Sequence, residues 1–131
     1  MKILLAEDDF ASRKFMDKYL SRFGECDITV DGKEAIEAFS MALEEGEPYD
    51  LICLDVMMPE MDGYQVLDKI RKMEEEQGIK GERAVKIIMT TALNEERNVR
   101  KAFDMNCTAY SGKPIDTEKF ELLLRKIGLI S

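Results

Sequence analysis

Five short apolar runs alternate with longer stretches of helical period, and this alternation limits the fold more than any other feature. The runs are KILLA at 2–6, DITV at 27–30, LICL at 51–54, KIIMT at 86–90 and TAYS at 108–111. Between and after the runs, apolar residues recur every three or four positions. This recurrence predicts five helices, which include Met16, Ala35, Val66, Val99 and Phe120. Alternating β–α units predict a parallel sheet with helices on both faces.

Right-handed connections and a count of five strands favour a doubly wound α/β sheet of order 2-1-3-4-5, flanked by five helices. In such a sheet, ligands bind beyond the carboxyl ends of the strands, where the strand order reverses between strands 1 and 3. Acidic residues stand at both strand ends: Glu7, Asp8 and Asp9 follow the first, and Asp55 follows the third. The sequence therefore predicts an acidic site at this edge of the sheet.

Length and composition exclude several classes of protein. The 131 residues fit one domain, residues 1–131. A net charge of −8 argues against a nucleic-acid surface. No apolar run approaches the ~18 residues of a membrane span, and the N-terminus lacks a signal sequence, so we expect no membrane insertion and a cytoplasmic location. The three cysteines, Cys26, Cys53 and Cys107, are expected to be buried reduced thiols.

The acidic residues need a counterion if they meet. Two carboxylates about 5 Å apart repel each other by roughly 3 kcal/mol at an effective dielectric constant near 20. One of them would otherwise hold a proton, because a nearby like charge raises its pKa. A hard divalent cation removes the repulsion, and oxygen ligands suit Mg²⁺. The sequence EDD alone also fits a cluster favoured by a helix N-terminus, but Asp55 at the neighbouring strand end favours the metal site.

Two further strand ends supply groups that suit a phosphoryl ligand. Thr90 and Thr91 end the fourth strand, and Lys113 follows the fifth. A threonine in a strand or a single lysine is weak support alone. Together, a hydroxyl and an ammonium facing a carboxylate–metal site are what a transferred phosphoryl group needs, because its oxygens must be neutralised and held.

With these residues identified, the sequence resembles the receiver domain of two-component response regulators. The resemblance covers essentially the whole chain and rests on LLAEDD, LICLDVMMPEMDG, IIMTTA and AYSGKP, in the family's order. It implies a flavodoxin-like receiver fold in which Asp55 accepts the phosphoryl group. It also implies that Glu7, Asp8, Asp55 and the backbone carbonyl of Met57 bind Mg²⁺ or Mn²⁺, with Asp9 outside the ligand set.

The resemblance implies further roles at the same site. Thr91 is expected to be the switch hydroxyl and Lys113 the phosphate-binding ammonium. Tyr110 is expected to be the aromatic switch, which turns inward when Thr91 engages the phosphoryl group; a half-exposed strand aromatic explains the same residue type. The family often has a cis bond at the position of Lys113–Pro114. Such a domain promotes its own aspartyl phosphorylation and autodephosphorylation.

The chain contains no histidine, so the phosphohistidine donor must be another chain, a histidine kinase or a histidine phosphotransfer protein. We expect such partners to dock on the first helix near Ala11, Ser12 and Phe15 and on the loop after Lys113. The fourth helix, fifth strand and fifth helix would form the output surface toward an unidentified downstream protein. The Met before the first strand favours a natural N-terminus, and the chain is either a single-domain regulator or part of a longer protein.

The sequence differs from the family's common form in one segment, and three other functions can be compared with its motifs. The stretch RKMEEEQGIKGERAVK, before the fourth strand, is longer than the family's common form. An aspartate-nucleophile phosphatase of the haloacid dehalogenase type would need a D-x-D pattern after the first strand, which this chain lacks. Glycine-rich nucleotide-binding motifs are also missing. The main alternative is a receiver-fold interaction module that works without phosphorylation. The intact set of acids, Thr91 and Lys113 argues against it.

Overall fold

The strands form one parallel sheet of order β2-β1-β3-β4-β5, as predicted. The structure is a computed structural model that describes residues 1–92 and 106–131. The strands are β1 (Lys2–Ala6), β2 (Glu25–Thr29), β3 (Leu51–Asp55), β4 (Lys86–Thr91) and β5 (Ala109–Gly112). The helices are α1 (Phe10–Leu20), α2 (Gly32–Glu44), α3 (Gly63–Glu76), a short 3₁₀ helix (Gly81–Arg83) and α5 (Thr117–Lys126). The helix expected around Val99 lies outside the described residues.

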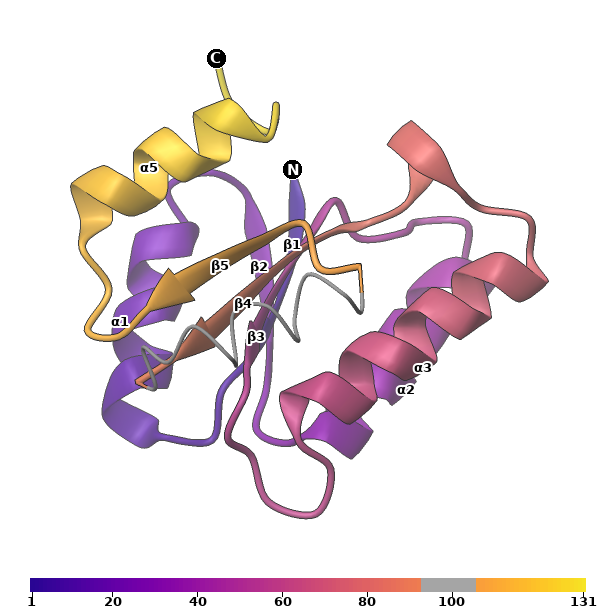
Figure 1. Cartoon of the computed structure of the whole chain (residues 1–131), viewed down its shortest axis with the longest axis horizontal. Coiled ribbons are helices and arrows are strands. Elements are labelled where there is room, and N and C mark those ends of the chain that lie inside the picture. The colour runs from indigo at the N-terminus through magenta and orange to yellow at the C-terminus, as the bar shows by residue number, and fades with distance from the viewer. Residues whose placement is uncertain (93–105) are drawn as a thin grey trace.

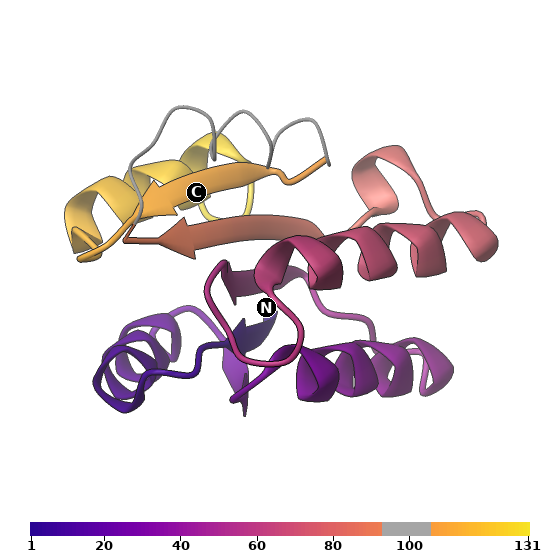
Figure 2. The ribbon, with the colours of Figure 1, turned by 60° about the horizontal axis from the view of Figure 1, so that its bottom comes forward.

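The sheet separates two apolar cores, one on each face. In Figures 1 and 2, α1 and α5 cover one face and α2 and α3 cover the other. Ile3, Leu5 and Phe120 belong to the core under α1 and α5. Leu4 and Phe39 belong to the core under α2 and α3. Because neighbouring strand residues point to opposite faces, a strand covered on both sides reads as a continuous apolar run, as KILLA does.

An aspartate is the N-cap residue of each of the four α-helices in the part of the chain that the structure describes. Asp9, Asp31 and Asp116 cap α1, α2 and α5, each accepting hydrogen bonds from backbone N–H groups of the first turn. Asp62 and Gln65 form a reciprocal capping box at the start of α3. These caps satisfy helix N–H groups that have no partner within the helix.

The second strand differs from its prediction by two residues at its start. The run DITV predicted residues 27–30, whereas β2 spans Glu25–Thr29. Glu25 enters the sheet because its N–H donates to the Met1 carbonyl at 3.0 Å. Val30 leaves the strand because its N–H donates to the Glu34 side chain at 3.0 Å. All three cysteines are free; Cys53 and Cys107 are buried as expected, whereas Cys26 is only half-buried.

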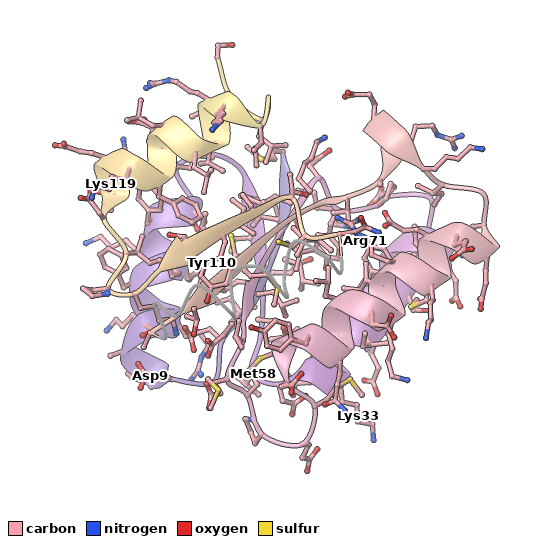
Figure 3. The ribbon with its side chains drawn as sticks, viewed as in Figure 1. Asp9, Lys33, Met58, Arg71, Tyr110 and Lys119 are labelled. Carbon is pink, nitrogen blue, oxygen red and sulfur yellow. The ribbon has the colours of Figure 1, made fainter. Side chains whose placement is uncertain are left out.

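Two side chains of α3, Arg71 and the buried Glu74, close the long connection between α3 and β4 through hydrogen bonds to Val85. Arg71 Nη1 lies 2.7 Å from Glu74 Oε1, and Glu74 is 3% exposed. The Glu74 carboxylate also accepts the N–H of Val85 at 2.7 Å. Figure 3 shows Arg71 reaching from α3 toward the connection before β5, where its Nε donates to the Asn106 carbonyl at 3.0 Å. Residues of α3 therefore hold the chain just before β4 and just before β5.

Candidate functional site

The candidate site lies where the carboxyl ends of four neighbouring strands meet. Glu7 directly follows β1, Asp55 ends β3, Thr91 ends β4 and Lys113 directly follows β5. The strands are parallel and paired in register, with Asp55 beside Thr90. Figure 1 shows β4 and β5 pointing toward this edge of the sheet. Residues up to 106 positions apart in sequence are thereby brought together.

Three carboxylates converge at this edge. Each of Glu7, Asp8 and Asp55 offers an oxygen within 4.8 Å of the others. Glu7 and Asp55 are buried, at 2% and 4% exposed, whereas Asp8 is exposed. Such a group of oxygen ligands, open to solvent on one side, fits a small hard cation that keeps some of its water. The structure brings together the three acids that the sequence singled out; their role as ligands remains a prediction.

Lys113 is the cation that already faces these acids. Its ammonium forms an ion pair with Glu7 and lies 3.4 Å from Asp55 Oδ1, and its side chain is 17% exposed. Burial opposes the charge on Lys113, but the Glu7 hydrogen bond and the two carboxylate charges outweigh burial and raise its pKa. Lys113 therefore remains charged and partly neutralises the cluster. The Lys113–Pro114 bond is cis, as the resemblance implies.

The cation-free site disfavours the ionised form of Asp55. Its pKa is raised to about 8, chiefly by burial, and the hydrogen bond and charge of Glu7 act in the same direction. Lys113 and the Met57 N–H, which donates to Asp55 Oδ1 at 3.3 Å, oppose the rise. A divalent cation or a second ammonium would favour the ionised form, which is the form that can act as a nucleophile.

The loop after β3 returns tightly toward Asp55. Gly63, the first residue of α3, donates its N–H to the Val56 carbonyl at 2.9 Å. A Cβ atom at Gly63 would lie 2.4 Å from the Asp55 carbonyl oxygen, so only glycine fits this approach. Figure 3 shows Met58 in this loop at the same end of the molecule as Asp9 at the start of α1. Met57 is 61% exposed, and metal binding by its carbonyl remains a prediction.

Thr91 and Tyr110 lie on the adjacent strands β4 and β5. Thr91 is fully buried and Tyr110 is half-buried. Burial raises the pKa of the Tyr110 hydroxyl, and a hydrogen bond with the Thr91 side chain opposes the rise. The two residues that the resemblance assigns to a switch are therefore in contact. Thr90 is also buried and lines a groove with Glu7 and Lys113.

Arg13 and Asp9 have roles near the acids that the sequence analysis did not predict. Arg13 Nη1 donates to the carbonyls of Glu7 and Asp8, both at 3.1 Å. Asp9 donates its N–H to Glu7 Oε2 at 3.2 Å and uses its own carboxylate to cap α1. The Ser12 hydrogen bonds lower the pKa of Asp9. The Asp9 carboxylate is thus engaged in capping α1, and its place outside the ligand set remains a prediction.

The parallel sheet and the carboxylate–lysine site at its edge are those of a phosphoryl-accepting signalling domain. The sequence matches the response regulator receiver domain family over residues 3–125. The chain belongs to this family, the receiver domains of two-component systems.

Relatives and solved structures agree with this family. The chain is 32% identical over 128 residues to hybrid signal transduction histidine kinase L of Dictyostelium discoideum, covering 97% of this chain but 7% of that protein. The receiver domain of the histidine kinase CKI1 from Arabidopsis thaliana, complexed with Mg²⁺ and BeF₃⁻, is similar with a TM-score of 0.79 and 27% identity, covering 96% and 88% of the two chains. The fold is also similar to a chain of the Saccharomyces cerevisiae co-crystal structure of the histidine phosphotransfer protein Ypd1 and the Ssk1 receiver domain, with a TM-score of 0.84, 24% identity and coverage of 98% and 88%.

Within the described residues, the helices are too short or too polar to cross a membrane.

Proposed function

We propose that residues 1–131 form a single receiver domain in which Asp55 accepts a phosphoryl group from a phosphohistidine on another protein. The observation that carries this proposal is the meeting of three carboxylates and Lys113 around the end of β3. Without a bound cation, ionisation of all three carboxylates is unfavourable, and the raised pKa of Asp55, about 8, reflects this. A set of repelling acids is useful where a cation and a phosphoryl group are to be bound.

The proposed transfer is a displacement at phosphorus. An ionised oxygen of Asp55 attacks the phosphorus atom, the phosphorus–nitrogen bond breaks, and the imidazole leaves with its electron pair. Glu7, Asp8, Asp55 and the Met57 carbonyl would hold Mg²⁺, or Mn²⁺ in its place. When bound, the cation neutralises charge on the transferred oxygens. Attack by water on the aspartyl phosphate later returns Asp55 and releases inorganic phosphate.

Three residues would respond to the new phosphoryl group. Lys113, whose ammonium lies 3.4 Å from Asp55 Oδ1, would neutralise one phosphoryl oxygen. Thr91 would donate its hydroxyl to another oxygen. Because Thr91 and Tyr110 share a hydrogen bond, movement of Thr91 changes the surroundings of Tyr110. Phosphorylation would reach the surface of β5, α5 and the helix expected between β4 and β5 in this way, for an unidentified downstream protein.

The donor would be a histidine kinase or a histidine phosphotransfer protein that docks beside α1. Phe15 is 47% exposed, which favours a contact role over a place in the core. Together with Ala11 and Ser12 it lines an apolar groove of about 330 Å³ that also includes Lys113 and Pro114. The structure of the Ypd1–Ssk1 complex offers a precedent for pairing of a receiver domain with a phosphotransfer protein.

The first test is the intact mass of the protein after incubation with Mg²⁺ and acetyl phosphate. The expected product carries one added phosphoryl group, and neither a chelator-treated sample nor Asp55→Asn forms it. If no adduct is seen, beryllofluoride with Mg²⁺ should still change the amide spectrum of the protein. The absence of both responses would favour a receiver-fold module that works without phosphorylation.

The role of Lys113 has a separate test. Lys113→Ala should retain Mg²⁺ binding but accept the phosphoryl group at least about tenfold more slowly, because one charge-assisted contact to the phosphoryl oxygens is lost. Lys80→Ala removes the same charge at an exposed loop position and serves as the control. Equal phosphorylation rates in the two variants would contradict the role given to Lys113.

A further inference from the structure

Arg13 links the start of α1 to both peptide groups that carry the acidic pair. Its Nη1 donates to the carbonyls of Glu7 and Asp8, each at 3.1 Å. The guanidinium also packs on the Phe10 ring, with Cζ 5.5 Å from the ring centroid. One half-buried side chain therefore holds the loop between β1 and α1 at two successive carbonyls.

The place of Arg13 in the helix is unfavourable for a cation. The cap of α1 is Asp9, so Arg13 falls at the end of the first turn, near the positive end of the helix dipole. A positive charge there is opposed by the dipole, whereas an acidic residue would be favoured. The two carbonyl oxygens compensate for this cost, because hydrogen bonds from a charged donor are stronger than those from a neutral one. Helix formation therefore does not explain an arginine at this position, whereas its hydrogen bonds to the two carbonyl oxygens do.

Asp8 depends on this contact more than the other acids do. The Glu7 side chain is held by Lys113 and by the Asp9 N–H. In the ranges 1–92 and 106–131, no hydrogen bond or ion pair holds the exposed Asp8 carboxylate. It nevertheless has an oxygen within 4.8 Å of those of Glu7 and Asp55. The direction of the Asp8 side chain is therefore set by its backbone, which Arg13 fixes.

We propose that Arg13 is a positioning residue of the acidic cluster: it orients the Glu7 and Asp8 peptide groups so that their carboxylates bind a divalent cation together with Asp55. This inference rests on the proposed Mg²⁺ site. Arg13 itself has no ligand atom for a cation, and its positive charge repels one. Charge alone therefore predicts that loss of Arg13 tightens Mg²⁺ binding, whereas positioning predicts that it weakens binding.

The test compares Mg²⁺ affinities of the full chain by isothermal titration calorimetry, without a phosphodonor. Arg13→Met keeps an apolar stem and removes the guanidinium. Lys14→Met removes the same charge at the next, exposed position and is the matched control. We expect about tenfold weaker binding for Arg13→Met, as is usual when a residue that orients metal ligands is lost. Lys14→Met should bind Mg²⁺ as tightly as the wild type or slightly more tightly.

A second readout separates positioning from general damage to the site. In phosphorylation assays, Arg13→Met should need more Mg²⁺ for half-maximal rate but reach the wild-type rate at saturating Mg²⁺. Cooperative unfolding of Arg13→Met without metal shows that this variant is folded. If it does not unfold cooperatively, Arg13→Lys takes its place in the test, because lysine retains the charge but not the geometry of the guanidinium. We expect the Mg²⁺ affinity of Arg13→Lys to be at least about threefold weaker than that of the wild type.

Two failures can be told apart. Suppose that the wild-type chain binds Mg²⁺ and that Arg13→Met, or Arg13→Lys if that variant is needed, binds it equally tightly. This result would overturn the role of Arg13 but leave the proposed metal site standing. A wild-type chain that binds no Mg²⁺ would overturn both the proposed metal site and the inference built on it.

Discussion

Adding one methyl group at Gly63 should destabilise the protein and displace Asp55 at the same time. The added Cβ atom would lie 2.4 Å from the Asp55 carbonyl oxygen and 2.8 Å from Val56 Cα. Both are backbone atoms, so no side chain can rotate to make room. The approach is about 1 Å closer than ordinary van der Waals contact allows. Either α3 or the end of β3 must move.

The expected loss of stability follows from two contributions. Overpacking of this kind costs about 1–3 kcal/mol. The hydrogen bond from the Gly63 N–H to the Val56 carbonyl, 2.9 Å long, would be strained or broken at a cost of about 1 kcal/mol. For a chain of this size, a total of about 2–4 kcal/mol lowers the Tm by about 8–15 °C.

Gly78→Ala provides the control for the Gly63→Ala variant. Gly78 has a φ of +70°, and a Cβ atom there would meet nothing within 4 Å, so alanine encounters backbone strain but no clash. We expect a loss of about 1 kcal/mol and unchanged Mg²⁺ affinity. Thermal unfolding by circular dichroism and Mg²⁺ titration of both variants provide the measurements. The steric argument is wrong if Gly63→Ala melts within about 2 °C of the wild type (about half a kcal/mol or less) or above Gly78→Ala.

Further predictions concern the buried charges. Mg²⁺ should bind about tenfold more tightly for each pH unit up to about 8, because the raised pKa of Asp55 means that one proton must leave; a pH-independent affinity in calorimetry would contradict this. The same raised pKa makes ionisation of Asp55 unfavourable in the folded state, so Asp55→Asn should stabilise the metal-free protein clearly more at pH 9 than at pH 4, measured by urea unfolding; an equal effect at the two pH values would contradict this. Glu74→Ala should lose about 3 kcal/mol, because it removes the ion-pair partner of half-buried Arg71 and the only carboxylate that accepts the buried Val85 N–H in the described chain. Asp68→Ala, at an exposed ion pair, should change stability by less than about 1 kcal/mol, and equal losses in the two variants would refute the comparison.

The parts of the fold that follow from local pattern were predictable from sequence. The buried run LICL, the order of the sheet and the gathering of acids at its edge all follow from burial on both faces and from parallel strands. The caps at Asp31 and Asp116 are local as well, because each accepts hydrogen bonds from backbone N–H groups two or three residues further on. These features depend on neighbours in sequence or on the general geometry of such sheets.

Contacts between distant residues were not predictable in the same way. The ion pair of Lys113 with Glu7 spans 106 positions and depends on the exact approach of β5 to β1 across β3 and β4. The hydrogen bonds of Arg13 depend on peptide orientations in a loop, for which the sequence has no periodic signal. The one available sign was a cation at the end of a helix's first turn, where the dipole disfavours it.

The way in which the α3–β4 connection is fastened makes it a place to attach a reporter. Arg71 and Glu74 secure the segment at Val85, before the first residue of β4, so the register of the sheet does not depend on the loop length. Gly78 and Gly81 face open space, and Lys80 between them is exposed. Lengthening a flexible loop costs only about 0.6 kcal/mol per doubling. A fluorescent tag inserted at Lys80 would therefore leave both termini of the chain free for study in living cells.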